Sequence, residues 1–153
     1  MYSKRLFYSF MIVFTLTGIF FLFRNTNFLQ NLYFEKKTYT IWKNKFNLYV
    51  ADTEKKITEG LSVFRTIKNN EWMIFIFLQE WNYWFWMKNM KFDIDLLWID
   101  KNWKIIWYIN NFKKETYPEI FFPQKNIKYV IELNSQAIEK YNIQTWNIIV
   151  QSK

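Results

Sequence analysis

Cysteine and histidine are both absent from this chain of 153 residues, and glycine and proline occur only twice each. The absence of cysteine and histidine excludes disulfides, thiol nucleophiles, Cys/His zinc sites, haem ligated through histidine, and every Ser-His or Cys-His catalytic arrangement. Only carboxylate and carbonyl oxygens remain as ligands for a metal ion, a donor set that suits Ca²⁺ or Mg²⁺. We expect no metal site and no cofactor.

Glycine is scarce in comparison with average usage of about 7%, which would give about 11 glycines in a domain of this length. The chain has 2 glycines and 9 tryptophans, and the two counts together reach that expected number. In other respects the composition is that of a folded domain, with 51% hydrophobic, 24% aromatic and 22% charged residues. These values exclude a disordered chain, and the length allows one domain.

The N-terminal region contains one long uncharged segment, residues 6–23, which follows Lys4 and Arg5 and ends at Arg24. As a helix its 18 residues would span about 27 Å, enough for a thin bilayer core. No small-x-small cleavage site follows it, so we predict an uncleaved signal anchor, a single transmembrane helix within residues 1–24; a cleaved signal peptide is the alternative. The basic start keeps the N-terminus cytoplasmic and predicts a membrane-anchored protein whose domain lies outside the cytoplasm, in the cell envelope.

The net charge of +8 comes from lysines that are scattered along the chain rather than concentrated in one patch. A nucleic-acid-binding surface would require such a patch, so we expect no nucleic-acid partner. A mildly basic surface is compatible with anionic lipid headgroups beside the predicted anchor.

Residues 25–36 have the composition of a tether, and residues 37–153 that of an exported β domain. Short alternating or apolar runs predict strands at residues 46–50, 73–77, 85–87, 94–99, 104–109, 128–133 and 148–151. A short helix is predicted over 53–61, one or two helical turns over 135–141, and a long loop over 111–126. This pattern predicts a mostly β fold, a compact antiparallel sandwich or barrel-like domain with one or two short helices.

Three predicted turns carry tryptophan where glycine is the usual residue, namely Trp42, Trp103 and Trp146. A tight turn at these positions needs a positive φ, which tryptophan disfavours. We therefore interpret several tryptophans as glycine positions, as would follow if the gene uses a code in which UGA means glycine. A natively tryptophan-rich domain is the alternative.

A family resemblance rests on short segments that follow one another in a fixed order over residues 46–150. They are VADT (50–53), Gly60-Leu61 with Arg65, WMIFIF (72–77), FWMKNM (85–90), IDLLWID (94–100), YVIEL (129–133), and Ile143 with Trp146. In these segments the chain resembles the domain of unknown function 192 family. The resemblance implies a compact β-sandwich-like or barrel-like domain that is often exported or membrane-anchored and has no established biochemical role.

The resemblance also bears on the tryptophans, because the family's pattern has glycine at Trp72, Trp103 and Trp146. Tryptophan fits the pattern at Trp86. The chain departs from the pattern at Asp93, where the family usually has proline, and at Ser62-Val63, where a methionine is usual.

Five polar residues interrupt apolar or aromatic segments and are the candidate ligand-binding residues: Arg65, Lys88, Asn89, Asp95 and Glu132. One interpretation gathers them around a single pocket for a polar small molecule, such as a glycan or a cell-wall fragment. The other is a buried network of ion pairs and hydrogen bonds that fixes the strand register. No residue is assigned a catalytic role.

A carboxylate-dependent hydrolase of envelope glycans, with Asp95 and Glu132 as its acids, is a further alternative. It requires both carboxyl groups in one open cleft, about 5–10 Å apart. A binding module requires a groove with an exposed aromatic residue beside it, whereas a purely structural or interaction protein would show neither. We predict a binding or envelope-associated module rather than an enzyme.

Overall fold

The computed structural model describes residues 27–152. The chain divides into two units, residues 1–33 and residues 34–153. In the first unit the described part is the helix α2 (Asn27–Tyr33), which lies within the predicted tether. The predicted transmembrane segment lies outside the described residues. Within residues 27–152 there is no helix with the length and hydropathy needed to cross a bilayer.

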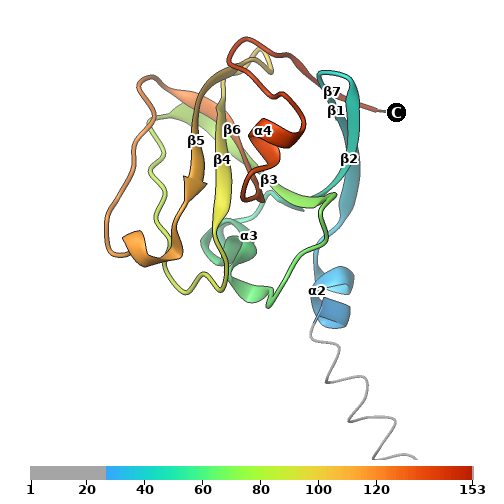
Figure 1. The fold of residues 1–153 in the computed structure, drawn as a ribbon, viewed down its shortest axis with the longest axis vertical. Helices are drawn as coiled ribbons and strands as arrows, with labels where there is room; N and C mark the ends of the chain where they lie inside the picture. Colours follow the sequence, from blue (N-terminus) through green and yellow to red (C-terminus); the bar gives the residue numbers. More distant parts are fainter. Residues whose placement is uncertain (1–26, 153) are drawn as a thin grey trace, which may run out of the picture. The chain divides into compact units, whose positions relative to one another are not determined.

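The second unit is built on one seven-stranded sheet (Figure 1) with the strand order β5-β4-β6-β3-β2-β1-β7. The strands are β1 (Lys36–Ile41), β2 (Asn44–Ala51), β3 (Glu71–Trp81), β4 (Ile94–Ile99), β5 (Ile105–Phe112), β6 (Ile127–Asn134) and β7 (Ile149–Gln151). The helical elements of this unit are α3 (Glu54–Glu59), η1 (Gly60–Val63), η2 (Lys114–Thr116) and α4 (Ala137–Lys140). The prediction of a mostly β domain with few short helices is confirmed.

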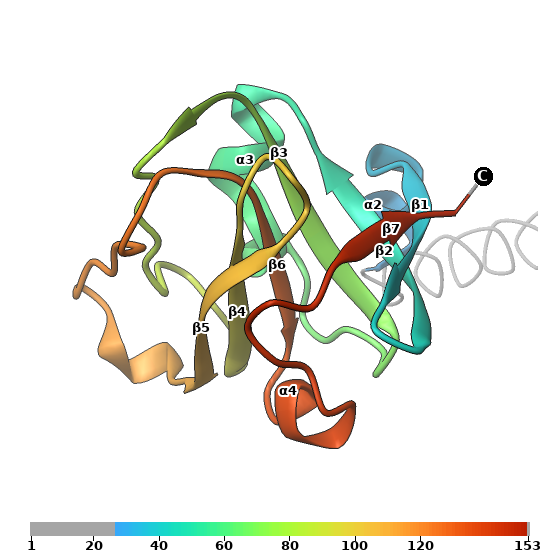
Figure 2. The ribbon, with the colours of Figure 1, turned by 90° about the horizontal axis from the view of Figure 1, so that it is seen from above.

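The sheet curls so that the beginnings of its two edge strands, β5 and β7, meet, and Figure 2 shows the strands following one another around this curve. An isolated bridge joins Lys104 to Ile148, and the N–H of Ile149 donates to the carbonyl of Trp103 at 2.9 Å. The expected two-sheet sandwich is therefore wrong, and the barrel-like alternative is closer. The expectation of a wholly antiparallel sheet is also wrong, because β2 and β3 pair in parallel and α3 and η1 lie in the connection between them.

Two hydrophobic clusters cover opposite faces of the sheet, because successive side chains of a strand alternate between faces. On the face here called the α4 face, Leu97, Ile131 and Leu133 pack with Ile138 of α4. On the other, called the α3 face, Leu96 and Met73 pack with Leu61 of η1. All six residues of β4 are buried, as expected for a strand covered on both sides.

The predicted elements at 53–61, 85–87 and 111–126 differ from the observed ones in their boundaries. The predicted helix at 53–61 appears as α3 followed by η1, and Thr53 is the N-cap residue, because its hydroxyl accepts the Lys56 N–H at 3.4 Å. The predicted strand at 85–87 is reduced to a single bridge between Phe85 and Phe121. The predicted loop at 111–126 begins with the last two residues of β5 and then contains η2.

The three turns singled out in the sequence all place tryptophan in the left-handed region. The φ angles are 57° at Trp42, 62° at Trp103 and 79° at Trp146. Trp72, by contrast, lies in β3 and is fully buried, with its Nε1–H donating to Asn134 Oδ1 at 3.1 Å. The backbone therefore favours glycine at three positions, whereas at Trp72 that interpretation rests on the family resemblance alone.

Candidate functional site

Glu132 is a buried carboxylic acid on β6 whose side chain lies on the α3 face of the sheet. Its backbone pairs with Met73 of β3 and Leu96 of β4, two apolar residues of that face. Only 6% of the residue is exposed, and Oε2 accepts the backbone N–H of Leu61 at 3.2 Å. Burial raises the pKa of Glu132 to about 7, against the opposing effect of the Leu61 hydrogen bond.

A cavity of about 600 Å³, here called the Glu132 cavity, opens beside this carboxyl group. Its walls come from α3, η1, the second half of β3 and the connection that follows β3. Its lining residues include Gly60, Phe75, Phe77, Tyr83, Lys88 and Glu132. A volume of this size is typical of small-molecule sites, which combine apolar walls with a few polar groups.

Gly60 allows the close approach that places Leu61 against the carboxyl group. Its φ of +51° is left-handed, and a Cβ added there would lie 3.3 Å from Phe75 Cζ and 3.5 Å from Glu132 Oε2. The backbone conformation thus requires glycine, and a Cβ would in addition make a tight contact with the Phe75 ring. Gly60 is one of only 2 glycines in the chain. It could therefore have indicated this wall of the cavity from the sequence, although it is not among the five candidate residues.

Aromatic rings form much of the cavity wall. The rings of Phe77 and Tyr83 stack with centroids 3.7 Å apart, and Phe75 meets Phe85 edge to face at 5.1 Å. The Tyr83 hydroxyl donates to the Gln79 carbonyl at 3.1 Å, which fixes this ring relative to β3. None of these four rings belongs to a tryptophan, so this part of the wall does not depend on which tryptophans are glycine positions; Trp81, Trp84 and Trp86 also line the cavity.

Lys88 and Asn89, two of the predicted site residues, also line the Glu132 cavity, and both are exposed. The Lys88 ammonium lies 4.9 Å from the centroid of the Trp86 ring. Asn89 has a φ of 61°, a left-handed conformation that asparagine tolerates better than most residues. The structure thus brings together three of the five predicted residues, with the carboxyl group buried and the two polar side chains exposed.

Asp95 lies elsewhere, although it is also buried. It pairs with Leu133, so its side chain is on the α4 face, opposite to Glu132. Its oxygens accept the backbone N–H groups of Asn111 at 2.8 Å, Gln136 at 3.1 Å and Ile138 at 2.8 Å. Burial raises the pKa of Asp95, although these donors oppose that shift. Asp95 therefore links β4 to the end of β5 and to α4.

Two sequence-based groupings are corrected by this arrangement. Arg65 is exposed and lines neither of the two cavities described here, so the five candidate residues do not share one pocket. Asp95 and Glu132 project from opposite faces of the same sheet and cannot flank one glycosidic bond. The two-carboxylate hydrolase therefore loses its proposed acid pair. Among residues 27–152, no cluster of three or more acidic side chains forms a metal site.

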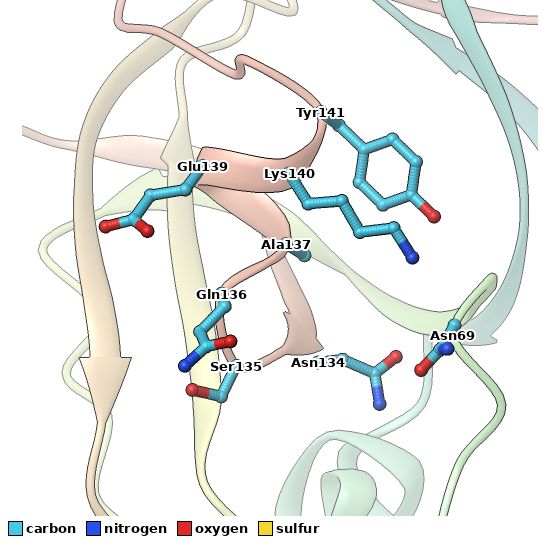
Figure 3. A pocket seen from close by; sticks show the side chains of 8 residues that line it. All are labelled: Asn69, Asn134, Ser135, Gln136, Ala137, Glu139, Lys140 and Tyr141. Atoms are coloured by element: carbon cyan, nitrogen blue, oxygen red, sulfur yellow. The ribbon is translucent and has the colours of Figure 1, made fainter.

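A second cavity of about 580 Å³ lies beside α4, and no sequence signal had indicated it. Figure 3 shows Lys140 and Tyr141 extending towards Asn69, while Glu139 points the other way. Glu139 accepts a hydrogen bond from Asn110 Nδ2 at 2.8 Å, and Asn134 accepts the one from Trp72. Because Asn134 and Glu139 already have protein partners, this hollow is the weaker candidate.

Comparison with known proteins gives a family and two similar folds. The model of the family DUF192, described as "Uncharacterized ACR", matches residues 36–148. No curated protein matches the sequence.

Two crystal structures share the fold. One, from Sinorhizobium meliloti 1021, is provisionally described as a transcription regulator; it has a TM-score of 0.73 and 19% identity, over 77% of this chain and 95% of the other. A protein of unknown function from Novosphingobium aromaticivorans DSM 12444 has a TM-score of 0.66 and 17% identity, over 76% and 84% of the two chains. At these identities the likeness establishes the fold alone.

Proposed function

Because the chain belongs to the DUF192 family of uncharacterised proteins, its function has to be argued from its own site, and we propose that it is a membrane-anchored module that binds a polar ligand, such as a glycan, outside the cytoplasm. The observation that carries this proposal is the Glu132 cavity. It combines a buried acid, stacked aromatic rings and two exposed polar side chains, Lys88 and Asn89.

Several features support binding of a sugar-like ligand. Aromatic faces pack well against the C–H groups of a sugar ring, and Trp84, exposed at 46%, lies at the same cavity. The Lys88 ammonium and the Asn89 amide can bond ligand hydroxyl groups, and Glu132 offers an acceptor at depth. Binding is favoured over catalysis because Asp95, the acid that the hydrolase alternative paired with Glu132, is on the opposite face of the sheet.

The membrane location is supported by the sequence alone. Residues 6–23 are uncharged and follow two basic residues, which is the pattern of a signal anchor with a cytoplasmic N-terminus. Membrane fractionation with an alkaline wash tests the anchor, and protease treatment of intact cells tests the side on which the domain lies. Release of the chain by the wash would refute the anchor.

Glycan binding is tested by titrating the full chain, in detergent micelles, with the N-acetylglucosamine tetramer and the glucosamine tetramer in a calorimeter. We expect saturable heat for at least one tetramer. Tyr83→Ala removes one ring of the stacked pair and should weaken this binding, by about 1–3 kcal/mol if the ring stacks on the sugar. Tyr108→Ala removes an exposed ring on β5, away from the cavity, and should leave binding unchanged.

Absence of binding by both tetramers would refute the glycan proposal. Binding that survives Tyr83→Ala unchanged would place the ligand outside the Glu132 cavity. A purely structural or interaction protein, the remaining alternative, would bind neither tetramer.

A further inference from the structure

We infer that the Glu132 cavity receives an organic ammonium group and that Glu132 is its counter-ion. This inference names the charge of the ligand and rests on the proposed function, since it uses the same cavity. The shared chemistry is a positively charged nitrogen carried by carbon groups, as in an amino sugar or a quaternary amine.

The first argument is that Glu132 lacks a partner for half of its carboxyl group. Oε2 accepts the Leu61 N–H, but Oε1 has no hydrogen-bond partner and the carboxyl group forms no ion pair with any described residue. A buried carboxylate without a counter-ion is costly. A ligand ammonium would supply both the missing charge and donors for the free oxygen.

The second argument is the composition of the walls. The faces of aromatic rings attract cations, and a carboxylate among such rings is the arrangement that recognises organic ammonium ions. Phe75, Phe77, Tyr83 and Phe85 all line the cavity. Lys88 is exposed and is held 4.9 Å from the Trp86 ring, so its charge is largely solvated.

Ionisation of Glu132 should therefore govern binding. Burial raises the pKa of Glu132 to about 7, and a bound cation favours the ionised carboxylate, so affinity for a permanent cation should fall as the pH falls below 7. Well below that pKa the loss approaches tenfold per pH unit.

Other titratable groups around the cavity are Glu59 of α3, and Tyr83 and Lys88 of the connection after β3. Glu59 lies 4.0 Å from the Lys55 ammonium and its side chain is 30% exposed. Facing Glu132 from β3 and β4 are the apolar side chains of Met73 and Leu96. Glu132 is therefore the buried carboxyl group of this cavity.

The test uses the full chain in detergent micelles and two matched pairs of probes. Choline is compared with its uncharged isostere 3,3-dimethylbutan-1-ol, and the glucosamine tetramer with the N-acetylglucosamine tetramer. We expect choline to bind at least tenfold more tightly than the alcohol at pH 8, and this preference to decline from pH 7 to pH 5. A preference for the glucosamine tetramer over the acetylated one would identify the amino-sugar source, and binding of choline alone a small quaternary amine.

Glu132→Gln keeps the shape and the acceptor for Leu61 but removes the charge. It should lower choline affinity at least tenfold at pH 8 and abolish the pH dependence, whereas Glu119→Gln, at an exposed position that does not line the cavity, should leave both unchanged. A thermal melt checks that Glu132→Gln is folded.

Each proposal can fail separately. Equal binding of charged and uncharged probes by the wild-type protein would overturn the ammonium inference while leaving glycan binding intact. Binding of choline but of neither tetramer would overturn the glycan proposal and support the ammonium site. Choline binding that Glu132→Gln does not change would remove Glu132 as the counter-ion.

Discussion

Three tryptophans have a backbone conformation that their own side chains disfavour. Trp42, Trp103 and Trp146 have left-handed φ angles, which cost a residue with a Cβ atom about 1–2 kcal/mol. Trp42 and Trp146 are exposed at 51% and 69%, so their rings recover little of this cost by burial. Trp103 recovers more, since it stacks on Tyr129 with centroids 3.8 Å apart. This agrees with our interpretation that these are glycine positions.

Replacing the most exposed of the three should therefore stabilise the domain. Trp146→Gly relieves the left-handed strain and removes an exposed ring whose centroid lies 4.1 Å from the Lys104 ammonium. It should raise the free energy of unfolding by about 1 kcal/mol. Urea denaturation measures this change.

Trp107→Gly is the matched control. Trp107 is exposed at 40% in β5, without a positive φ, and glycine there should lower the free energy of unfolding by about 1 kcal/mol. If both variants are destabilised equally, the backbone at Trp146 carries no strain. Peptide masses from the native organism would settle independently which residue is present.

At the scale of elements, Asp95 connects β4 to the end of β5 and to α4 by hydrogen bonds on the α4 face. Its carboxylate accepts N–H groups from Asn111, Gln136 and Ile138, which belong to or flank β5 and α4. A helix as short as α4 has little stability of its own, so this anchor and the apolar contact of Ile138 hold it in place.

Asp95→Asn should weaken these hydrogen bonds. The amide NH₂ would face one of the three N–H donors, leaving a buried donor without an acceptor, and we expect a loss of about 2–3 kcal/mol in the free energy of unfolding. Hydrogen exchange should locate the loss at Asn111 and at residues 136–138. Asp52→Asn, which removes an exposed pairing with Lys56, should change stability by less than about 0.5 kcal/mol. An unchanged exchange rate at residues 136–138 would contradict this role.

Most strands could be predicted from the sequence, because burial on one or both faces leaves a readable pattern. The strands at 94–99 and 128–133 correspond closely to β4 and β6. Strand β1 was missed, since its residues 36–41 alternate lysine and threonine with tyrosine and isoleucine at the border of a supposed tether. The parallel pairing of β2 with β3 could not be predicted, because it depends on how the connection through α3 crosses the sheet.

The candidate site could be predicted only in part from the sequence. Glu132 and Asp95 both interrupt apolar strands, and nothing in their spacing shows that the β4–β6 register places them on opposite faces. Their separation follows from which residues are cross-strand partners, and only the folded sheet contains that information. Lys88 and Asn89 were predicted because they interrupt an aromatic segment, and the fold places both at the Glu132 cavity.

At the scale of the whole molecule, Glu132 makes stability depend on pH. Its pKa is about 7 in the folded protein and near 4.5 when unfolded, so the folded state holds the proton more tightly. The stabilisation is complete below the unfolded pKa and is lost as the pH rises through 7, to a total of about 3 kcal/mol. Burial raises the pKa of Asp95 as well, which acts in the same direction.

We therefore expect the free energy of unfolding to decrease between pH 5 and pH 8, as measured by urea denaturation at several pH values. Glu132→Gln should remove most of this decrease and should be more stable than the wild type at pH 8. Glu119→Gln, at an exposed position, should follow the wild-type curve. A wild-type stability that rises over this range would show that Glu132 is ionised in the folded protein.

The pairing of β1 with β7 also has a consequence for the order in which the domain can assemble. Tyr39, Thr40 and Ile41 pair with residues 149–151, so the first strand of the sheet is completed by the last. A chain that leaves the ribosome N-terminus first can form the β1–β2 hairpin early, but it cannot cover the outer edge of β1 until residue 151 has emerged. During this interval the edge presents free N–H and C=O groups to other chains. For residues 39–41 of β1, the risk of pairing with another molecule is therefore confined to synthesis and ends when the final strand docks.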